Sequence, residues 1–340
     1  MSLVTNAFTS YSGDSGSKRN RETFSDLISM ITPEETPFYS LIRKESVDGT
    51  HPEWSTDTLA TPVTTNKNFE GDTYAFTAIT PTVRVGNYCQ ISMKQFAITE
   101  TQEVVSKAGP KSEVGRERAK KGIDLRCDIE AAMLSNNASI AGAQVTARQS
   151  GGMRAWLATN DSIAGGGSSG GFNSSTGVVD AATNGSSQRT FTKTLLDDNI
   201  ELVYKAGGNP TVLMLSPYLK RVFSTFMSDS NVAAFRTPLT GKSQGTIVGA
   251  ADCYLSDFGL IDVVPNRQMA RVGATLNRNA YLITPDKVAK GFLRDIQEDK
   301  EVAKTGDALP RVIKAEWTLI VKNEAAHGCI ADLFGTTSST

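Results

Sequence analysis

Histidine is the side chain best suited to proton transfer and metal binding near neutral pH. The sequence contains only two, His51 and His327, and neither belongs to a cluster of Cys and His with the spacing of a zinc site. A Ser-His-Asp triad can draw its members from any part of a chain, but nothing in the sequence points to one. We therefore interpret His51 as a surface residue beside Pro52 and His327 as a packed residue near the last strand.

Glycine-rich turns can bind phosphate or present a nucleophile, and three segments have some of the required residues. Residues 166–170 match the nucleophile-elbow pattern and 165–170 the dinucleotide-binding pattern, yet both lie in one Gly- and Ser-rich stretch without the necessary strand and helix. Residues 241–243, Gly-Lys-Ser, resemble the end of a phosphate-binding loop, but Arg236 stands where that loop needs its first glycine. The sequence predicts no catalytic, cofactor-binding or metal-binding residue, and we expect the protein not to be an enzyme.

The composition is that of a folded protein with a large core. The chain has 340 residues, of which 39% are apolar and 21% charged, enough for two or three lobes. Its net charge of -1 argues against tight DNA binding, which needs a basic excess. No apolar run reaches the length of a membrane span, and no signal peptide is predicted. The four cysteines form no CxxC pair, so reduced thiols are expected: Cys89, Cys127, Cys253 and Cys329.

The first half of the chain predicts an arm, a hairpin and a long helix. Residues 1–21 are too polar to order themselves, a short helix fits 24–31, and an extended or turning segment fits 31–42. Strict alternation over 83–93 predicts one half-buried strand, for which Tyr74, Phe76 and their neighbours can supply the partner. Such a two-stranded ribbon is barely stable alone, so we expect it to lie on a neighbouring subunit.

Helix signals follow the hairpin. Thr99 and Gln102 have capping-box spacing, which favours a helix over 103–108, and Ser112 can cap a longer one over 113–136. Two i,i+4 ion pairs would support the long helix: Glu117 with Lys121, and Arg126 with Glu130. The Gly- and Ser-rich residues 151–191 predict an exposed, mobile loop, except that 153–157 should dock on the body.

The second half predicts an α/β lobe and a final strand. Leu196, Ile200 and Val203 mark a helix that Gly207 stops, and Ser216-Pro217 begins another. The remaining elements are strands over 211–215, 246–248, 252–255, 260–264 and 280–283, and an alternating half-buried strand over 313–321.

This order of elements resembles the HK97-type capsid fold, an α+β fold with an N-terminal arm, an extended β-hairpin called the E-loop, a spine helix, a peripheral domain and an axial domain. Five segments resemble a family of phage major head proteins, a likeness that covers most of residues 20–335: 31–42, 128–134, 256–259, 303–307 and 318–333. The implied divisions are the arm and short helix (1–46), the E-loop (47–98), the peripheral domain with its spine helix (99–150), the Gly- and Ser-rich loop (151–191), the axial domain (192–290), a return to the peripheral domain (291–335) and a polar tail (336–340).

The resemblance implies a major capsid protein that assembles into pentamers and hexamers and forms an icosahedral head around double-stranded DNA, which it does not bind sequence-specifically. It also implies a portal, a separate scaffolding protein because no long charged prodomain precedes the arm, and in some relatives decoration proteins. The expected location is the virion, after assembly in the bacterial host cytoplasm, with no membrane contact. Two alternatives stay open: an encapsulin-like cellular compartment, and, from another class, a hydrolase with a scattered triad.

Overall fold

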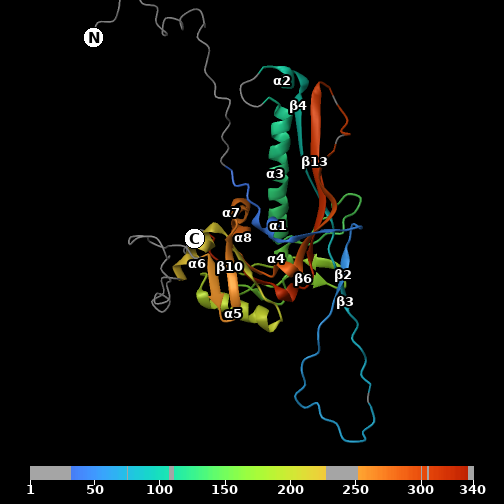
Figure 1. Ribbon diagram of the computed structural model, residues 1–340, viewed down its shortest axis with the longest axis vertical. Helices are drawn as coiled ribbons and strands as arrows, with labels where there is room; N and C mark the ends of the chain where they lie inside the picture. Colours follow the sequence, from blue (N-terminus) through green and yellow to red (C-terminus); the bar gives the residue numbers. More distant parts are fainter. Residues whose placement is uncertain are drawn as a thin grey trace, which may run out of the picture.

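Two β-sheets and one long helix organise the chain (Figure 1). The computed structural model describes residues 32–74, 76–106, 111–226, 252–299, 301–304 and 306–335. The predicted arm, the helix over 24–31, the strand over 246–248, the Gly-Lys-Ser segment and the polar tail lie outside these ranges.

The helices and strands have the following bounds. The α-helices are α1 (Pro37–Leu41), α2 (Glu100–Val104), α3 (Glu113–Leu134), α4 (Met153–Trp156), α5 (Lys193–Lys205), α6 (Pro217–Thr225), α7 (Arg267–Val272) and α8 (Ala274–Asn277). The strands are β1 (Arg43–Ser46), β2 (Glu53–Thr56), β3 (Val83–Gly86), β4 (Gln90–Thr99), β5 (Asp161–Ser162), β6 (Gly171–Asn173), β7 (Val178–Asp180), β8 (Val212–Leu215), β9 (Cys253–Ser256), β10 (Gly259–Pro265), β11 (Ala280–Ile283), β12 (Val288–Asp299), β13 (Ala308–Val321) and β14 (Gly328–Ile330). Two 3₁₀ turns are η3 (Pro285–Lys287) and η4 (Glu324–Ala326).

Helix α3 begins where the sequence predicts. The Ser112 side chain accepts a hydrogen bond from the backbone N–H of Gly115, and the helix runs for 22 residues, roughly 33 Å, to Leu134. Its C-terminal half packs Leu125, Ile129 and Met133 into the core, so burial of this face stabilises the helix.

Both predicted ion pairs along this helix are wrong. Glu117 pairs with Arg116, and Lys121 pairs with Asp124. Glu130 turns inward and accepts hydrogen bonds from other elements, because its position falls on the buried face of the helix.

The first sheet has the strand order β1-β12-β13-β4, with β13 antiparallel to both neighbours and β1 parallel to β12. Ile313, Ala315 and Trp317 of β13 join the same core cluster as the buried face of α3, which fits their alternation in the sequence. The strand is longer than predicted, and its second half is buried on both faces. Beyond Gln90, where the pairing with β4 ends, the Ser150 hydroxyl accepts from the Leu319 N–H at the edge of the sheet.

The second sheet has the order β5-β14-β11-β8-β10-β9. Alternate residues of β8 point to opposite faces of the sheet and pack into two different hydrophobic clusters. Leu213 and Leu215 pack with α5 and α6, while Val212 and Met214 belong to the cluster around α3. The predicted helices of this lobe are confirmed, with Thr192 and Ser216 as their N-caps. Strands β12 and β14 were not predicted, and β14 brings the last part of the chain into the second sheet rather than the first.

The single strand predicted over 83–93 is wrong, because the chain leaves one ribbon and enters another sheet within this span. Strand β3 pairs with β2, whereas β4 pairs with β13, and residues 87–89 connect them. The predicted partner around Tyr74 is also wrong: the ribbon pairs Thr56 with Val83, and the described residues between them form no strand.

The bounds of one helix and the structure of one short segment also differ from prediction. Helix α2 occupies 100–104 rather than beginning at Glu103, because the Thr99 hydroxyl caps it directly. The segment over 31–42, predicted to be extended or turning, contains the short helix α1, which starts at Pro37.

The Gly- and Ser-rich segment 151–191 is not simply exposed. It contains β5 and the β6–β7 hairpin, and Val179 is completely buried in the core. The prediction that 153–157 docks is confirmed, since these residues, which include α4, are buried.

Candidate assembly surface

A long loop, residues 57–82, leaves the body between β2 and β3 and extends away from both sheets (Figure 1). Its large apolar side chains are exposed, five of the six by 86% or more: Leu59, Val63, Phe69, Tyr74, Phe76 and Ile79. Six large apolar side chains exposed in one loop are a substantial apolar area, and burying that area is strongly favourable. The loop therefore has the properties of a surface that becomes buried in an assembly.

The base of this loop is rigidly attached to the body by Asn87. Its side-chain amide donates to the carbonyl oxygens of Leu319 (2.8 Å) and Gly151 (3.2 Å), and its oxygen accepts from the Gly151 N–H (2.8 Å). Asn87 is fully buried, so these bonds are shielded from water. The loop thus starts from a fixed platform formed by β13 and the residues after α3.

Aromatic stacking holds the other strand of the ribbon. The Trp54 ring stacks on Trp156, which in turn stacks on Phe172, with centroid distances of 5.5 and 6.1 Å. The Trp54 Nε1–H donates to the carbonyl of Val321. Both strands of the ribbon are therefore anchored to the first sheet and to segment 151–191.

A second attachment holds the chain that follows the N-terminal region. Glu130 accepts from the backbone N–H groups of Phe38 (2.9 Å) and Tyr39 (2.5 Å) and from the Asn266 amide (2.6 Å). Burial raises the pKa of Glu130, while these hydrogen bonds act in the opposite direction. Lys290, which also donates to the Tyr39 carbonyl, supplies the nearby positive charge. These contacts attach helix α1 to helix α3.

Arg154 and Asp161 form an ion pair in which neither side chain has exposed surface. Burial raises the pKa of Asp161 to about 6, and the adjacent Arg154 guanidinium counteracts that shift. The pair joins α4 to β5 and so fixes segment 151–191 beside the second sheet. The pair is closed off from solvent, and Arg189 and Asp332 lie near enough to act on the Asp161 carboxylate, which is consistent with a structural role.

The two histidines lie in different environments. His327 is buried as predicted, and its Nδ1 accepts from the backbone N–H of Thr284 (3.2 Å). His51 lies beside Pro52 with a quarter of its side chain exposed, and its ring stacks on Tyr88 at a centroid distance of 4.0 Å. The described residues contain no group of three or more His, Cys, Asp and Glu that could hold a metal ion.

His327 leads to a testable pH effect on stability. Burial lowers its pKa from 6.5 to about 4, so below pH 6.5 the unfolded chain binds a proton that the folded chain excludes. We expect this histidine alone to cost on the order of 3 kcal/mol of unfolding free energy as the pH falls from 6.5 to 4. Asp161 acts in the opposite sense, because its raised pKa favours the folded state at lower pH.

The difference between wild type and His327→Asn isolates the histidine. The asparagine oxygen can take the place of Nδ1 and accept from Thr284, but it does not titrate. Urea unfolding of subunits between pH 4 and 7 should give a flatter stability profile for the variant below pH 6.5. Two parallel profiles would contradict this expectation.

The glycine motifs do not form chemical sites in the described residues. Residues 165–170 lie between β5 and β6, so they precede a strand and do not connect a strand to a helix. The four cysteines are free, and Cys253 is the exposed one. None of the described helices has the length and apolar content that a membrane span needs.

The contacts that hold these segments together come from three polar residues whose partners were not predicted: Asn87, Glu130 and Arg154. Each makes its contacts across more than one element, so no local spacing could identify the partners. The one signal in the sequence for such a contact is a polar residue within a stretch whose apolar pattern predicts burial, as for Glu130 between Ile129 and Met133. A buried polar residue needs a hydrogen-bond partner.

Comparison with known proteins agrees with this architecture. The family described as SU10 major capsid protein matches residues 3–334. The major capsid protein of Escherichia phage Phieco32 is 33% identical over 116 residues, a match that spans 34% of this chain and about a third of that protein.

Solved structures are similar over nearly the whole chain. A capsid asymmetric unit of cyanophage A-1(L) has a TM-score of 0.63 and 14% identity, and it covers 93% of this chain and 98% of its own. An encapsulin complex from Synechococcus elongatus PCC 7942 has a TM-score of 0.55 and 9% identity, over 95% of both chains. The fold is the HK97-type fold of capsid proteins, and the chain belongs to the SU10 major capsid protein family.

Proposed function

We propose that the protein is a phage major capsid subunit that self-assembles into pentamers and hexamers and forms an icosahedral head around the genome. The observation that carries this proposal is the loop 57–82, whose exposed apolar residues require a neighbouring molecule, in a chain of a capsid family. Closed symmetry lets many modest contacts add to a stable shell, while each remains weak enough to correct errors during assembly.

The role is structural. The net charge of -1 suits a wall that surrounds double-stranded DNA without gripping it, because tight binding needs a basic excess. The subunit would assemble in the host cytoplasm, with a portal, a separate scaffolding protein and, where present, decoration proteins as partners.

The encapsulin alternative rests on likeness of fold alone, at 9% identity, and no described pocket favours a cargo peptide. The family match favours the phage head.

Expression of the full chain tests the proposal. We expect purified protein to contain capsomers or closed hollow particles, measured by light scattering and negative-stain electron microscopy. Co-expression with the scaffolding protein of the same phage should make the particles uniform in size. A protein that stays monomeric at high concentration under both conditions would contradict the proposal.

A further inference from the structure

The ion pair between Arg154 and Asp161 uses only part of the hydrogen-bonding capacity of the two side chains. Its one hydrogen bond joins Arg154 Nη1 to Asp161 Oδ2. In the part of the chain that the structure describes, Arg154 Nε, Arg154 Nη2 and Asp161 Oδ1 are buried and have no hydrogen-bond partner. Neither side chain has exposed surface, so bulk solvent cannot hydrate these three atoms.

Buried polar atoms nearly always have a partner, because leaving one unpaired in a medium of low dielectric constant is costly. The guanidinium group of Arg154 can only donate, so its two free nitrogens need an acceptor. The ionised carboxylate of Asp161 can only accept, so its free oxygen needs a donor. A molecule that serves both residues must therefore accept and donate hydrogen bonds.

The nearby charged residues have partners of their own. Arg189 donates to the Ser162 hydroxyl (2.9 Å), and Asp332 accepts from the Gly185 N–H (2.8 Å). Together with the buried pair they make two positive and two negative charges, so the group as a whole is neutral. An added anion would leave one negative charge unbalanced in a closed site, which is unfavourable. A neutral molecule is therefore the better occupant.

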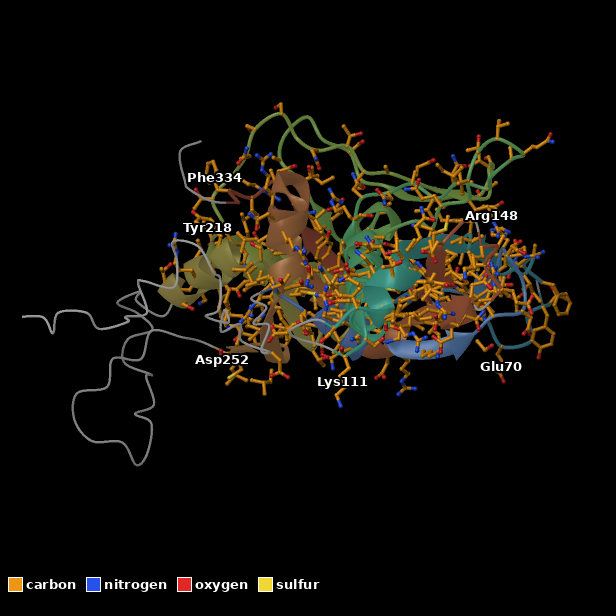
Figure 2. All side chains as sticks on the ribbon, turned by 90° about the horizontal axis from the view of Figure 1, so that it is seen from above. Glu70, Lys111, Arg148, Tyr218, Asp252 and Phe334 are labelled. Atoms are coloured by element: carbon orange, nitrogen blue, oxygen red, sulfur yellow. The ribbon has the colours of Figure 1, made fainter. Side chains whose placement is uncertain are left out.

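The site lies where the segment 151–191 meets the second sheet. Seen from above, the green ribbon of this segment runs along one side of the molecule, and Lys111 and Asp252 lie on the other side (Figure 2). Asp161 of β5 pairs in register with Cys329 of β14, which brings the segment against the sheet. The site is thus enclosed only after this segment has folded onto the second sheet.

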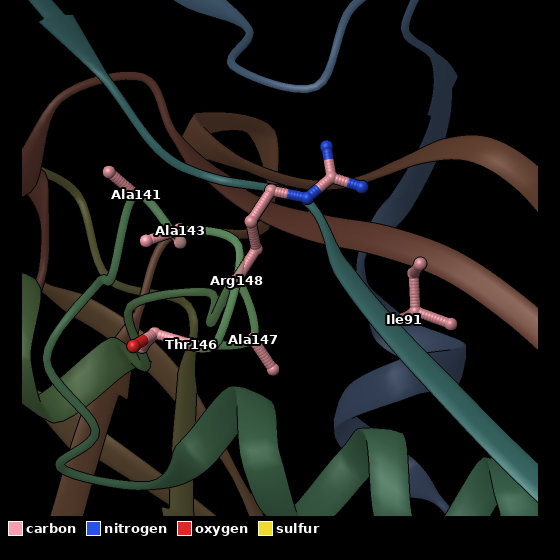
Figure 3. A pocket seen from close by; sticks show the side chains of 7 residues that line it. Ile91, Ala141, Ala143, Thr146, Ala147 and Arg148 are labelled. Atoms are coloured by element: carbon pink, nitrogen blue, oxygen red, sulfur yellow. The ribbon is translucent and has the colours of Figure 1, made fainter.

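Arg148 provides a contrast, because it lines an open groove between β4 and the hairpin formed by residues 140–149 (Figure 3). Its Nη2 donates to Glu316 (2.5 Å), and a quarter of its side chain is exposed. Bulk water can therefore reach the rest of this guanidinium group. Arg154 has the same hydrogen-bonding needs without that access.

We propose that an internal water molecule binds between Arg154 and Asp161, where it accepts from the guanidinium group and donates to Asp161 Oδ1. Water is neutral and small, and it supplies both kinds of contact. Buried waters typically make about three hydrogen bonds to polar groups that the protein itself leaves unpaired. The water is then a structural part of the joint between the segment 151–191 and the second sheet, and its binding does not depend on assembly.

An experimental structure of the full chain, as free subunits or in particles, tests the site at a resolution that shows ordered waters. We expect a density peak about 2.7–3.2 Å from Asp161 Oδ1 and from a guanidinium nitrogen of Arg154. The double variant Arg154→Met with Asp161→Leu should lose the peak, because its apolar side chains offer water no partner. Arg148→Met, the control in the open groove, should keep it. A wild-type structure in which protein groups take up the three free atoms, or a peak that persists in the double variant, would overturn the inference.

A salt comparison distinguishes water from a bound anion. Urea unfolding of free wild-type subunits in sodium chloride and in sodium fluoride of equal ionic strength should give the same midpoint, because water is present in both. A higher midpoint in chloride that Arg154→Met abolishes and Arg148→Met retains would identify chloride as the occupant and refute the assignment of water.

Discussion

Replacing residues 57–82 by an Asn-Gly turn is expected to give a folded subunit that forms no particles. The turn joins Thr56 to Val83, which already face each other in the ribbon, and a two-residue Asn-Gly turn fits such a hairpin. The body should be unaffected, because Asn87 and Trp54 fix the ribbon independently of the loop. Size-exclusion chromatography with light scattering, circular dichroism and electron microscopy would together measure the loss of assembly and the retention of the fold.

Two substitution sets separate the apolar character of the loop from its length. Leu59→Ser, Phe69→Ser and Phe76→Ser together should prevent assembly as the deletion does, since they remove about half of the exposed large apolar side chains. The matched set Asn66→Ser, Asn68→Ser and Thr73→Ser should leave assembly intact. Normal particles from the deletion variant would show that the loop has no part in the shell.

Breaking the buried ion pair should have the largest effect on stability. Arg154→Met leaves Asp161 as an unpaired buried carboxylate, and we expect a loss of about 3–5 kcal/mol in the free energy of unfolding. The double variant Arg154→Met with Asp161→Asn removes both charges and should recover much of that loss. Urea unfolding in the loop-deleted background measures both values without a contribution from assembly.

An exposed pair provides the control. Arg43 and Asp286 also form an ion pair, but about three quarters of each side chain is exposed, so Arg43→Met should cost about 0–1 kcal/mol. A similar cost for Arg43→Met and Arg154→Met, or a double variant less stable than the single one, would contradict the role assigned to burial.

The elements that local patterns specify were predictable from the sequence. Ser112, Thr192 and Ser216 are helix caps whose signal lies within a few residues, and each caps a helix in the structure. Strand β8 is a short run of buried residues between turn signals, which is also a local pattern. These elements include the spine helix and the body of the α/β lobe.

The failures occur where distant residues decide the structure. The apolar side of the alternation over 83–93 is interrupted only at Asn87, whose side chain bonds to β13 where the chain passes from the ribbon into the first sheet. The Gly- and Ser-rich segment looked exposed because its glycines are flexible, yet Gly170 lies so close to Ala155 and Asp180 that a side chain would clash with the backbone. Neither contact can be read from spacing along the sequence.

The candidate assembly surface shows the same difference between what local patterns predict and what contacts between distant residues decide. The sequence predicts a two-stranded ribbon that needs a neighbour, because such a ribbon is marginally stable alone. The structure instead has a short ribbon that carries the loop 57–82 with its exposed apolar side chains.

The sheet order also determines when during synthesis a subunit becomes complete. Among the described residues, β1, β4 and β5 each pair with a single strand, respectively β12, β13 and β14, and all three partners come from residues 288–330. Contacts this distant in sequence form late and slowly, because the entropy of closing the intervening chain must be overcome first. A ribosome-bound chain therefore exposes its apolar loop long before β4 has gained its partner strand. Association that needs the completed first sheet must therefore wait until residues 288–321 have been made and paired.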